Sequence, residues 1–260
     1  MHKKLVLIAL TLFTAFCNAT IVEFQTNQGN FRVNLFDNDT PETVNNFLMY
    51  ATSERYDNVI IHRSAPGFVI QGGGFSISTD TNDEIRIEQI DTLPPIINEP
   101  VFSNVRGTIA MAKSSDPNSA TSQWFFNLED NSGAVSNANL DTQNEGFTVF
   151  GQVIDDGMDV VDQIAALEVY NFGGTLGQLP LIDYTTEDYA DDVTPLEEQF
   201  VIIHSVVVID ADPDTAEGLD PVRNTLINEV DEEDDFDTGS FGYALISLLI
   251  LGTLRRRKFQ

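Results

Sequence analysis

Hydrophobic and polar residues alternate along much of the chain between residues 21 and 209, with the period of two that is typical of β-strands. Two alternating runs, at 21–24 and 31–36, flank a short Asn- and Gly-containing stretch, and this pattern predicts a hairpin. Further β-prone segments are expected at residues 61–74, 84–88, 107–113, 122–127, 146–153 and 200–209. The chain is therefore predicted to be mainly β.

Two segments instead repeat their apolar residues at helical spacing. The first begins at Thr40, a favourable N-cap residue, followed by Pro41 at the first helical position. Its apolar face carries Val44, Phe47, Leu48 and Ala51. The second helix is expected at about residues 157–167, with Met158, Val161, Ile164 and Ala165 facing inward. Many strands with one early and one late helix favour a closed antiparallel barrel capped by two helices.

The first nineteen residues have the pattern of a secretory signal. Lys3 and Lys4 precede an apolar stretch at 5–16, and the small-residue site that follows predicts cleavage after Ala19. An alternative is a lipoprotein signal in which Cys17 is lipidated. Because Cys17 is the only cysteine, cleavage after Ala19 leaves a mature chain that cannot form a disulfide.

The amino-acid composition changes at two points in the last fifty residues. Residues 211–238 are acidic and low in aromatic residues, which predicts a solvated linker. Residues 239–260 contain fourteen mostly apolar positions, at 241–254, followed by a basic cluster at 255–258 that is expected to stay in the cytoplasm. This tail resembles bacterial C-terminal sorting tails of the GlyGly-CTERM kind, which implies cleavage near residues 239–241. A permanent C-terminal membrane anchor is the open alternative.

Net charge excludes one class of partner. The chain has 13 Lys and Arg against 41 Asp and Glu, a formal charge of −28, so it would repel a phosphate backbone and no nucleic-acid binding is expected.

Residues 171–199 form a polar, acidic insertion without a basic residue. Asp210, Asp212 and Asp214 have the spacing of a calcium loop, but Thr215 stands where such a loop requires Gly, so calcium binding is not expected.

A few residues stand out within the strand-rich region. Residues 61–74 form an apolar run that contains Arg63 and Gln71 and ends in three glycines. An unpaired buried Arg is costly, so Arg63 must reach solvent or a partner. The order of residues here resembles the signature of cyclophilin-type peptidyl-prolyl isomerases. Three further stretches match that family in order, at residues 107–112, 122–126 and 147–151.

The resemblance covers about residues 21–209. It implies a closed eight-stranded antiparallel barrel capped by two α-helices, proline-containing polypeptides as substrates, a monomer, and no metal or other cofactor. By position it implies that Arg63, Gln71 and Phe125 are catalytic. The residues that it implies for substrate binding are Phe68, Val69, Ala112, Lys113, Gln123, Leu140 and Phe147.

Within this set the resemblance implies distinct roles. Phe68 and Phe125 would form the walls of a proline pocket and Leu140 its floor, while Gln71 and Gln123 would hold Arg63 and the substrate backbone. His62, next to Arg63, would face the other side of the strand and be structural. The sequence also departs from the family pattern: Ile61 replaces a usual Phe, Val69 a frequent Met, and Asn139 a frequent aromatic residue. Phe147 stands where eukaryotic members have His, although bacterial members often carry an aromatic residue there.

The chemistry of the X-Pro bond explains why such a set suffices. Rotation is slow because the nitrogen lone pair is delocalised into the carbonyl, which gives a barrier of about 18–20 kcal/mol. A fixed cationic donor near the prolyl nitrogen, with an apolar pocket around the ring, favours the twisted state. Arg suits this role because it stays charged and its fork can be oriented by neighbours.

The sequence therefore predicts an exported prolyl isomerase with its catalytic domain at residues 20–210. We expect it in the periplasm or at the cell surface, and in contact with a membrane only through residues 239–260. The alternative is a non-catalytic, cyclophilin-like module that holds peptides or partner proteins at the cell envelope. The joint presence of Arg63, Gln71, Gln123 and Phe125 favours the enzyme, because a degenerate module does not need all four.

Overall fold

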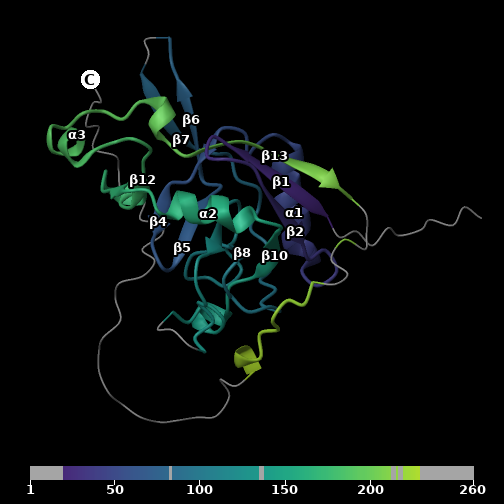
Figure 1. Ribbon diagram of the computed structural model, residues 1–260. Helices are drawn as coiled ribbons and strands as arrows, with labels where there is room; N and C mark the ends of the chain where they lie inside the picture. The colour runs from purple at the N-terminus through teal and green to yellow at the C-terminus, as the bar shows by residue number, and fades with distance from the viewer. Residues whose placement is uncertain (1–19, 82–83, 135–137, 212–214, 216–218, 229–260) are drawn as a thin grey trace, which may run out of the picture.

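The computed structural model describes residues 20–81, 84–134, 138–211, 215 and 219–228 (Figure 1). The expected signal sequence, the C-terminal tail and two of the three calcium-spaced aspartates lie outside these ranges. Within the described residues no helix is long and apolar enough to cross a membrane. The same residues contain no group of three or more His, Cys, Asp or Glu side chains placed to hold a metal ion.

One antiparallel sheet of eleven strands forms the body of the protein, in the order β4-β5-β9-β8-β10-β2-β1-β13-β3-β6-β7. A separate pair, β11 and β12, is also antiparallel. The strands are β1 (Ile21–Thr26), β2 (Phe31–Leu35), β3 (Val59–Ile60), β4 (Arg63–Ala65), β5 (Val69–Gly72), β6 (Phe75–Thr79), β7 (Ile85–Gln89), β8 (Thr108–Met111), β9 (Trp124–Asn127), β10 (Val149–Ile154), β11 (Val169–Tyr170), β12 (Leu179–Pro180) and β13 (Ile202–Asp210).

The mainly β fold is confirmed, and the sheet is strongly curved. β3 and β4 stand far apart in the strand order, yet only Ile61 and His62 separate them in the chain. The amide of Ile61 donates to Val201 O beside β13, whereas the amide of His62 donates to Gln71 O in β5. The main sheet contains eleven strands rather than eight, and no ladder among the described strands joins the two ends of its order. A closed eight-stranded barrel therefore stays a prediction.

Both predicted helices are present, as α1 (Pro41–Thr52) and α2 (Gly157–Ala165). α1 packs against β13, and α2 packs against β2 and β10. A third helix, α3 (Thr186–Ala190), lies in the acidic insertion and was not predicted. Short 3₁₀ turns complete the list: η1 (Gln143–Glu145), η2 (Gly174–Leu176), η3 (Glu197–Gln199) and η4 (Leu226–Asn228).

The cap of α1 differs from the predicted one. Thr40 occupies the N-cap position, but its side chain makes no capping bond and instead donates to Phe36 O. The carboxylate of Glu99 accepts from the amides of Glu42 and Thr43, at 3.4 and 2.9 Å. A carboxylate satisfies free amides at a helix N-terminus and also complements the helix dipole. The helix is therefore capped by a residue more than fifty positions away.

Two hydrophobic clusters occupy opposite faces of the sheet, because successive side chains along a strand point to opposite sides. In β9, Trp124 and Phe126 belong to the main core, where Phe24 packs edge-on against both rings. Phe125, between them, belongs to a second cluster on the other face. This second cluster also contains Phe36, Val69, Phe102, Ala110, Leu140, Phe147 and Val149.

The acidic insertion builds a third cluster with the β6–β7 hairpin. Tyr170, Leu179 and Tyr184 are buried there against Ile77 of β6, with Ile85 and Ile87 of β7 packed alongside. Figure 1 shows β6, β7 and α3 on the same side of the molecule. The predicted surface excursion is thus a folded unit attached to the sheet.

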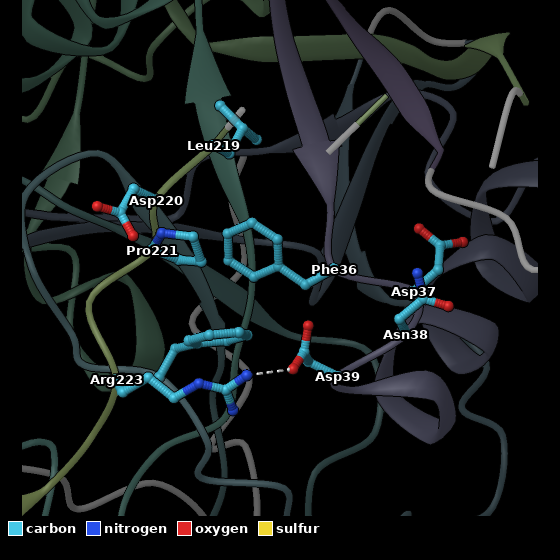
Figure 2. A pocket seen from close by; sticks show the side chains of 9 residues that line it. Phe36, Asp37, Asn38, Asp39, Leu219, Asp220, Pro221 and Arg223 are labelled. Carbon is cyan, nitrogen blue, oxygen red and sulfur yellow. Dashed lines mark hydrogen bonds and ion pairs between the residues drawn. The ribbon is translucent and has the colours of Figure 1, made fainter. Parts of the chain in front are cut away.

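Residues 219–228 are bound to the rest of the protein through residues 101–103, where a solvated linker was predicted. The amide of Ser103 donates to Val222 O at 2.8 Å, and the amide of Asn224 donates to Val101 O at 2.9 Å. The Arg223 guanidinium is 2.9 Å from the Asp39 carboxylate (Figure 2). The linker interpretation is therefore wrong for this segment, which we call the C-terminal strap.

Candidate active site

The three residues predicted to be catalytic lie in one row across neighbouring strands. Arg63 of β4 is opposite Gln71 of β5, and Gln71 is opposite Phe125 of β9. The row continues to Ala110 of β8 and Val149 of β10. Residues opposite one another on paired strands share a face of the sheet. The strand register alone therefore brings the cationic, amide and aromatic groups together.

A shallow hollow of about 20 Å³ opens on this face. It is lined by nine of the ten predicted site residues: Arg63, Phe68, Val69, Gln71, Ala112, Lys113, Phe125, Leu140 and Phe147. The tenth, Gln123, stands behind Gln71. A larger hollow of about 300 Å³ lies between residues 36–39 and the C-terminal strap, and shares no lining residue with the first (Figure 2).

The floor of the smaller hollow is apolar and well packed. The rings of Phe125 and Phe147 meet edge to face, with centroids 5.9 Å apart and planes at 70°. Leu140 and Val69 complete the floor, and both are almost fully buried. Such a surface is suited to the ring of a proline, which has no polar atom to satisfy.

Arg63 is held at the rim of the hollow by two amide oxygens. One of its terminal nitrogens donates to Gln71 Oε1 at 3.4 Å, and its Nε donates to Gln178 Oε1 at 3.0 Å. The guanidinium carbon lies 5.9 Å from the centroid of the Phe68 ring. Burial lowers the pKa of Arg63 from its usual 12.5, but guanidinium groups in proteins stay protonated.

Gln71 is itself oriented by Gln123. Gln71 Nε2 donates to Gln123 Oε1 at 2.9 Å, which leaves Gln71 Oε1 facing Arg63. The glycine run makes this approach possible. Gly73 has a φ of +75°, and a Cβ atom on Gly74 would lie 2.8 Å from Cδ of Gln123. Gly74 thus makes room for Gln123 behind Gln71, whereas a Cβ atom on Gly72 or Gly73 would meet the Trp124 ring.

Lys113 lines the hollow and also fastens the loop that carries Phe147. Its Nζ donates to Asn144 O at 2.7 Å and to Gly146 O at 2.6 Å, and lies 5.0 Å from the Phe147 ring centroid. The side chain is buried, and this burial lowers the pKa of Lys113 from 10.5 to about 8. Lys113 therefore positions the aromatic floor in addition to forming a wall.

A buried polar centre holds the same loop from behind. Asn104 is fully buried, and its Nδ2 donates to Asp141 Oδ1 at 3.0 Å and to Phe147 O at 3.1 Å. Asn104 Oδ1 accepts from Asn127 Nδ2 at 3.3 Å. The C-terminal strap adds a bond from Asn224 Nδ2 to Asp141 O at 2.8 Å. The positions of Leu140 and Phe147 thus depend on side chains from several distant segments.

Sequence reasoning missed Gln178, Asn104 and Asn224. Each acts through a partner that lies far away in the chain: Arg63 is 115 residues from Gln178, and Asp141 is 83 residues from Asn224. Isolated amide side chains in polar segments carry no local signal of such contacts. Only the strand pairing and the course of the insertion bring them to the site.

His62 lies next to Arg63 and is 3% exposed, beneath the sheet face that carries the hollow. Its ring meets Phe75 edge-on, with centroids 5.0 Å apart. Burial, together with the positive charge of Arg63, lowers the pKa of His62 from 6.5 to about 3. The ring is therefore neutral at physiological pH.

This neutral, buried histidine makes the fold sensitive to acid. Between pH 6.5 and about 3 the unfolded chain binds a proton that the folded chain does not, so stability falls as pH falls, by about 1.4 kcal/mol per pH unit in that window. We expect His62→Gln, which cannot ionise, to remove this component. Urea unfolding of both proteins at pH 7, 6, 5 and 4 measures it. Exposed His204→Gln is the matched control, and identical pH slopes for wild type and His62→Gln would contradict the prediction.

Comparison with known proteins identifies the family of the chain. The sequence profile of the family described as cyclophilin type peptidyl-prolyl cis-trans isomerase/CLD matches residues 21–184. A peptidyl-prolyl cis-trans isomerase of Acinetobacter baylyi is 42% identical over 156 residues, which are 59% of this chain and 76% of that protein. Peptidyl-prolyl cis-trans isomerase B of Escherichia coli is 44% identical over 146 residues, 55% of this chain and 83% of that protein.

Among solved structures, a cyclophilin type peptidyl-prolyl cis-trans isomerase of Cryptosporidium parvum, determined in the presence of the dipeptide Ala-Pro, is 24% identical. The alignment covers 73% of this chain and 99% of that chain, with a TM-score of 0.48. The family profile spans more than half of the present chain, and both bacterial relatives carry the same activity in their names. The chain belongs to the cyclophilin-type peptidyl-prolyl cis-trans isomerases and is an enzyme of that activity.

Proposed function

We propose that this isomerase acts outside the cytoplasm on unfolded or extended polypeptides that contain proline, and so assists the folding of exported proteins. It works as a monomer, in the periplasm or at the cell surface, and contacts a membrane only through its C-terminal segment. The observation that carries the mechanism is the placement of Arg63 at the rim of an apolar hollow, held there by Gln71. A module that only holds peptides would not need this arrangement.

In the proposed mechanism, Phe68, Phe125 and Leu140 grip the proline ring while the residue before it stays free to rotate. As the X-Pro bond twists, the nitrogen lone pair localises and can accept a hydrogen bond from Arg63. A hydrogen bond to a charged group contributes about 1.5–3 kcal/mol, and each tenfold of rate needs about 1.4 kcal/mol. One such bond thus accounts for an increase of about 10- to 100-fold in the isomerisation rate. No nucleophile, proton transfer or cofactor is needed.

The start of the described chain supports export with cleavage after Ala19. Thr20 is buried, and its backbone nitrogen donates to Asp37 Oδ2 at 2.8 Å. Its hydroxyl donates to Asp37 Oδ1 at 3.0 Å. Cleavage would turn this backbone nitrogen into an α-ammonium group, and Asp37 would then pair with it as a counter-ion. A new charged terminus at Thr20 would therefore be accommodated without rearrangement.

Mass spectrometry of the protein from its native host tests export and the fate of the tail together. We expect a species in the envelope fraction that begins at Thr20 and lacks the basic cluster at 255–258. Leu10→Arg, which interrupts the apolar part of the signal, is the matched control and should leave the protein in the cytoplasm. Wild-type protein found in the cytoplasm with its first nineteen residues intact would contradict export. A species ending at Gln260 in the inner membrane would favour the permanent anchor.

A further inference from the structure

The acidic insertion reaches the guanidinium group of the active site. Gln178, which lies between η2 and β12, places its Oε1 3.0 Å from Nε of Arg63. The bond between Arg63 and the predicted partner Gln71 is longer, at 3.4 Å. Arg63 is thus held on two edges of its planar group, and the shorter bond comes from the insertion.

The backbone of the insertion fixes Gln178 in this position. Arg63 and Gln178 form a parallel bridge, and the amide of Ser64 donates to Gln178 O at 2.8 Å. The next residue, Leu179, is 1% exposed and anchors the segment in the third hydrophobic cluster. The side chain of Gln178 is exposed, so a substitution there removes the contact to Arg63 without opening a cavity.

Holding Arg63 on two edges matters for its proposed task. A guanidinium has five N–H donors in one plane, so two amide oxygens on different nitrogens define both the position and the tilt of that plane. The remaining donors can then point toward the prolyl nitrogen. An arginine that is oriented before the substrate binds loses less conformational freedom when the bond twists.

We propose that Gln178 is a positioning residue for Arg63, and that residues 171–199 therefore form part of the active-site rim. This inference rests on the proposed role of Arg63. It assigns to the insertion a function in catalysis, which neither the family match nor the strand pattern indicates. Because the contact is exposed to solvent, its expected effect on the rate is moderate.

The test compares three variants of the full chain in an X-Pro peptide isomerisation assay. Gln178→Ala should lower kcat about three- to tenfold with KM within about twofold of wild type and an unchanged Tm, since the backbone contacts remain. Gln178→Glu keeps an oxygen acceptor at the same reach and should restore kcat to within about twofold. Gln199→Ala is the matched control: its side chain bonds only Leu196 and Asp183, so Tm should fall while kcat stays.

A double variant separates this inference from the mechanism on which it rests. In the Arg63→Ala background, Gln178→Ala should have no further effect, because its contribution acts through the guanidinium. If Gln178→Ala lowered kcat equally in the wild-type and Arg63→Ala backgrounds, the positioning role alone would be overturned. The same holds if Gln178→Ala kept the wild-type kcat while Arg63→Ala had a reduced kcat. Wild-type activity in Arg63→Ala would instead overturn the proposed mechanism.

Discussion

Arg63→Ala is expected to lower kcat/KM for a short X-Pro peptide by at least about tenfold, which corresponds to about 1.4 kcal/mol, while leaving the fold intact. Arg63 is half-buried at the rim of the hollow, and its charged group contacts only side chains of the site. Its removal takes away the donor that, in the proposed mechanism, stabilises the twisted prolyl nitrogen. The apolar floor remains, so the peptide should still bind and the loss should appear mainly in kcat.

Two further variants make the result specific. Arg63→Lys keeps the positive charge but loses the fork that Gln71 and Gln178 hold, so we expect an intermediate rate. Arg86→Ala is the matched control, because Arg86 is an exposed strand arginine paired with Asp80 outside the site. The rate is followed by the cis-to-trans conversion of the peptide, with circular dichroism to check the fold. An Arg63→Ala protein as active as wild type would contradict the mechanism.

Asn104→Ala is expected to have the largest effect on stability, lowering the free energy of unfolding by about 3–5 kcal/mol. The substitution removes one donor from the carbonyls of Leu140 and Phe147 and from the carboxylate of Asp141. The backbone amides of residues 104 and 147 still donate to Asp141 and Leu140. These acceptors are buried, and water cannot replace the lost bonds at no cost. Because the same loop carries the floor of the hollow, KM for the peptide should also rise.

Urea unfolding measures the first effect, and peptide kinetics well below the unfolding midpoint measure the second. Asn45→Ala is the matched control, since Asn45 is exposed on α1 and should change the free energy of unfolding by no more than about 0.5 kcal/mol. If Asn104→Ala unfolded at the same urea concentration as wild type, the polar centre behind the loop would not contribute as described.

The sequence predicted the central row of the candidate site because those residues lie in strands whose order and period can be recognised. Arg63, Gln71 and Phe125 belong to three separate runs, and antiparallel pairing sets them opposite one another. The period of two also separates Phe125 from Trp124 and Phe126, so the division between core and site follows from the pattern. The two main helices were predicted for the same reason, since their apolar faces repeat at helical spacing.

The features that the sequence did not predict depend on long-range contacts, which leave little trace in local sequence. Glu99 caps α1 from another loop, and Thr40, the favourable residue nearby, does not. The C-terminal strap is held by backbone bonds to residues 101–103 and by the pairs Arg223–Asp39 and Asn224–Asp141. Composition correctly marks this region as acidic and poor in aromatic residues, but backbone hydrogen bonding does not depend on composition.

For a permanently anchored tail, the strap would also set the length of free chain between the enzyme and the membrane. A linker that began after Asp210 would contain about thirty residues before the apolar segment at 241–254. It could extend to about 110 Å at about 3.6 Å per residue. Since the strap is hydrogen-bonded to the rest of the protein as far as Asn224, only about sixteen residues remain before residue 241, with a reach of about 60 Å. If the tail stayed in the bilayer, as in the permanent-anchor alternative, the isomerase would remain within about that distance of the membrane surface.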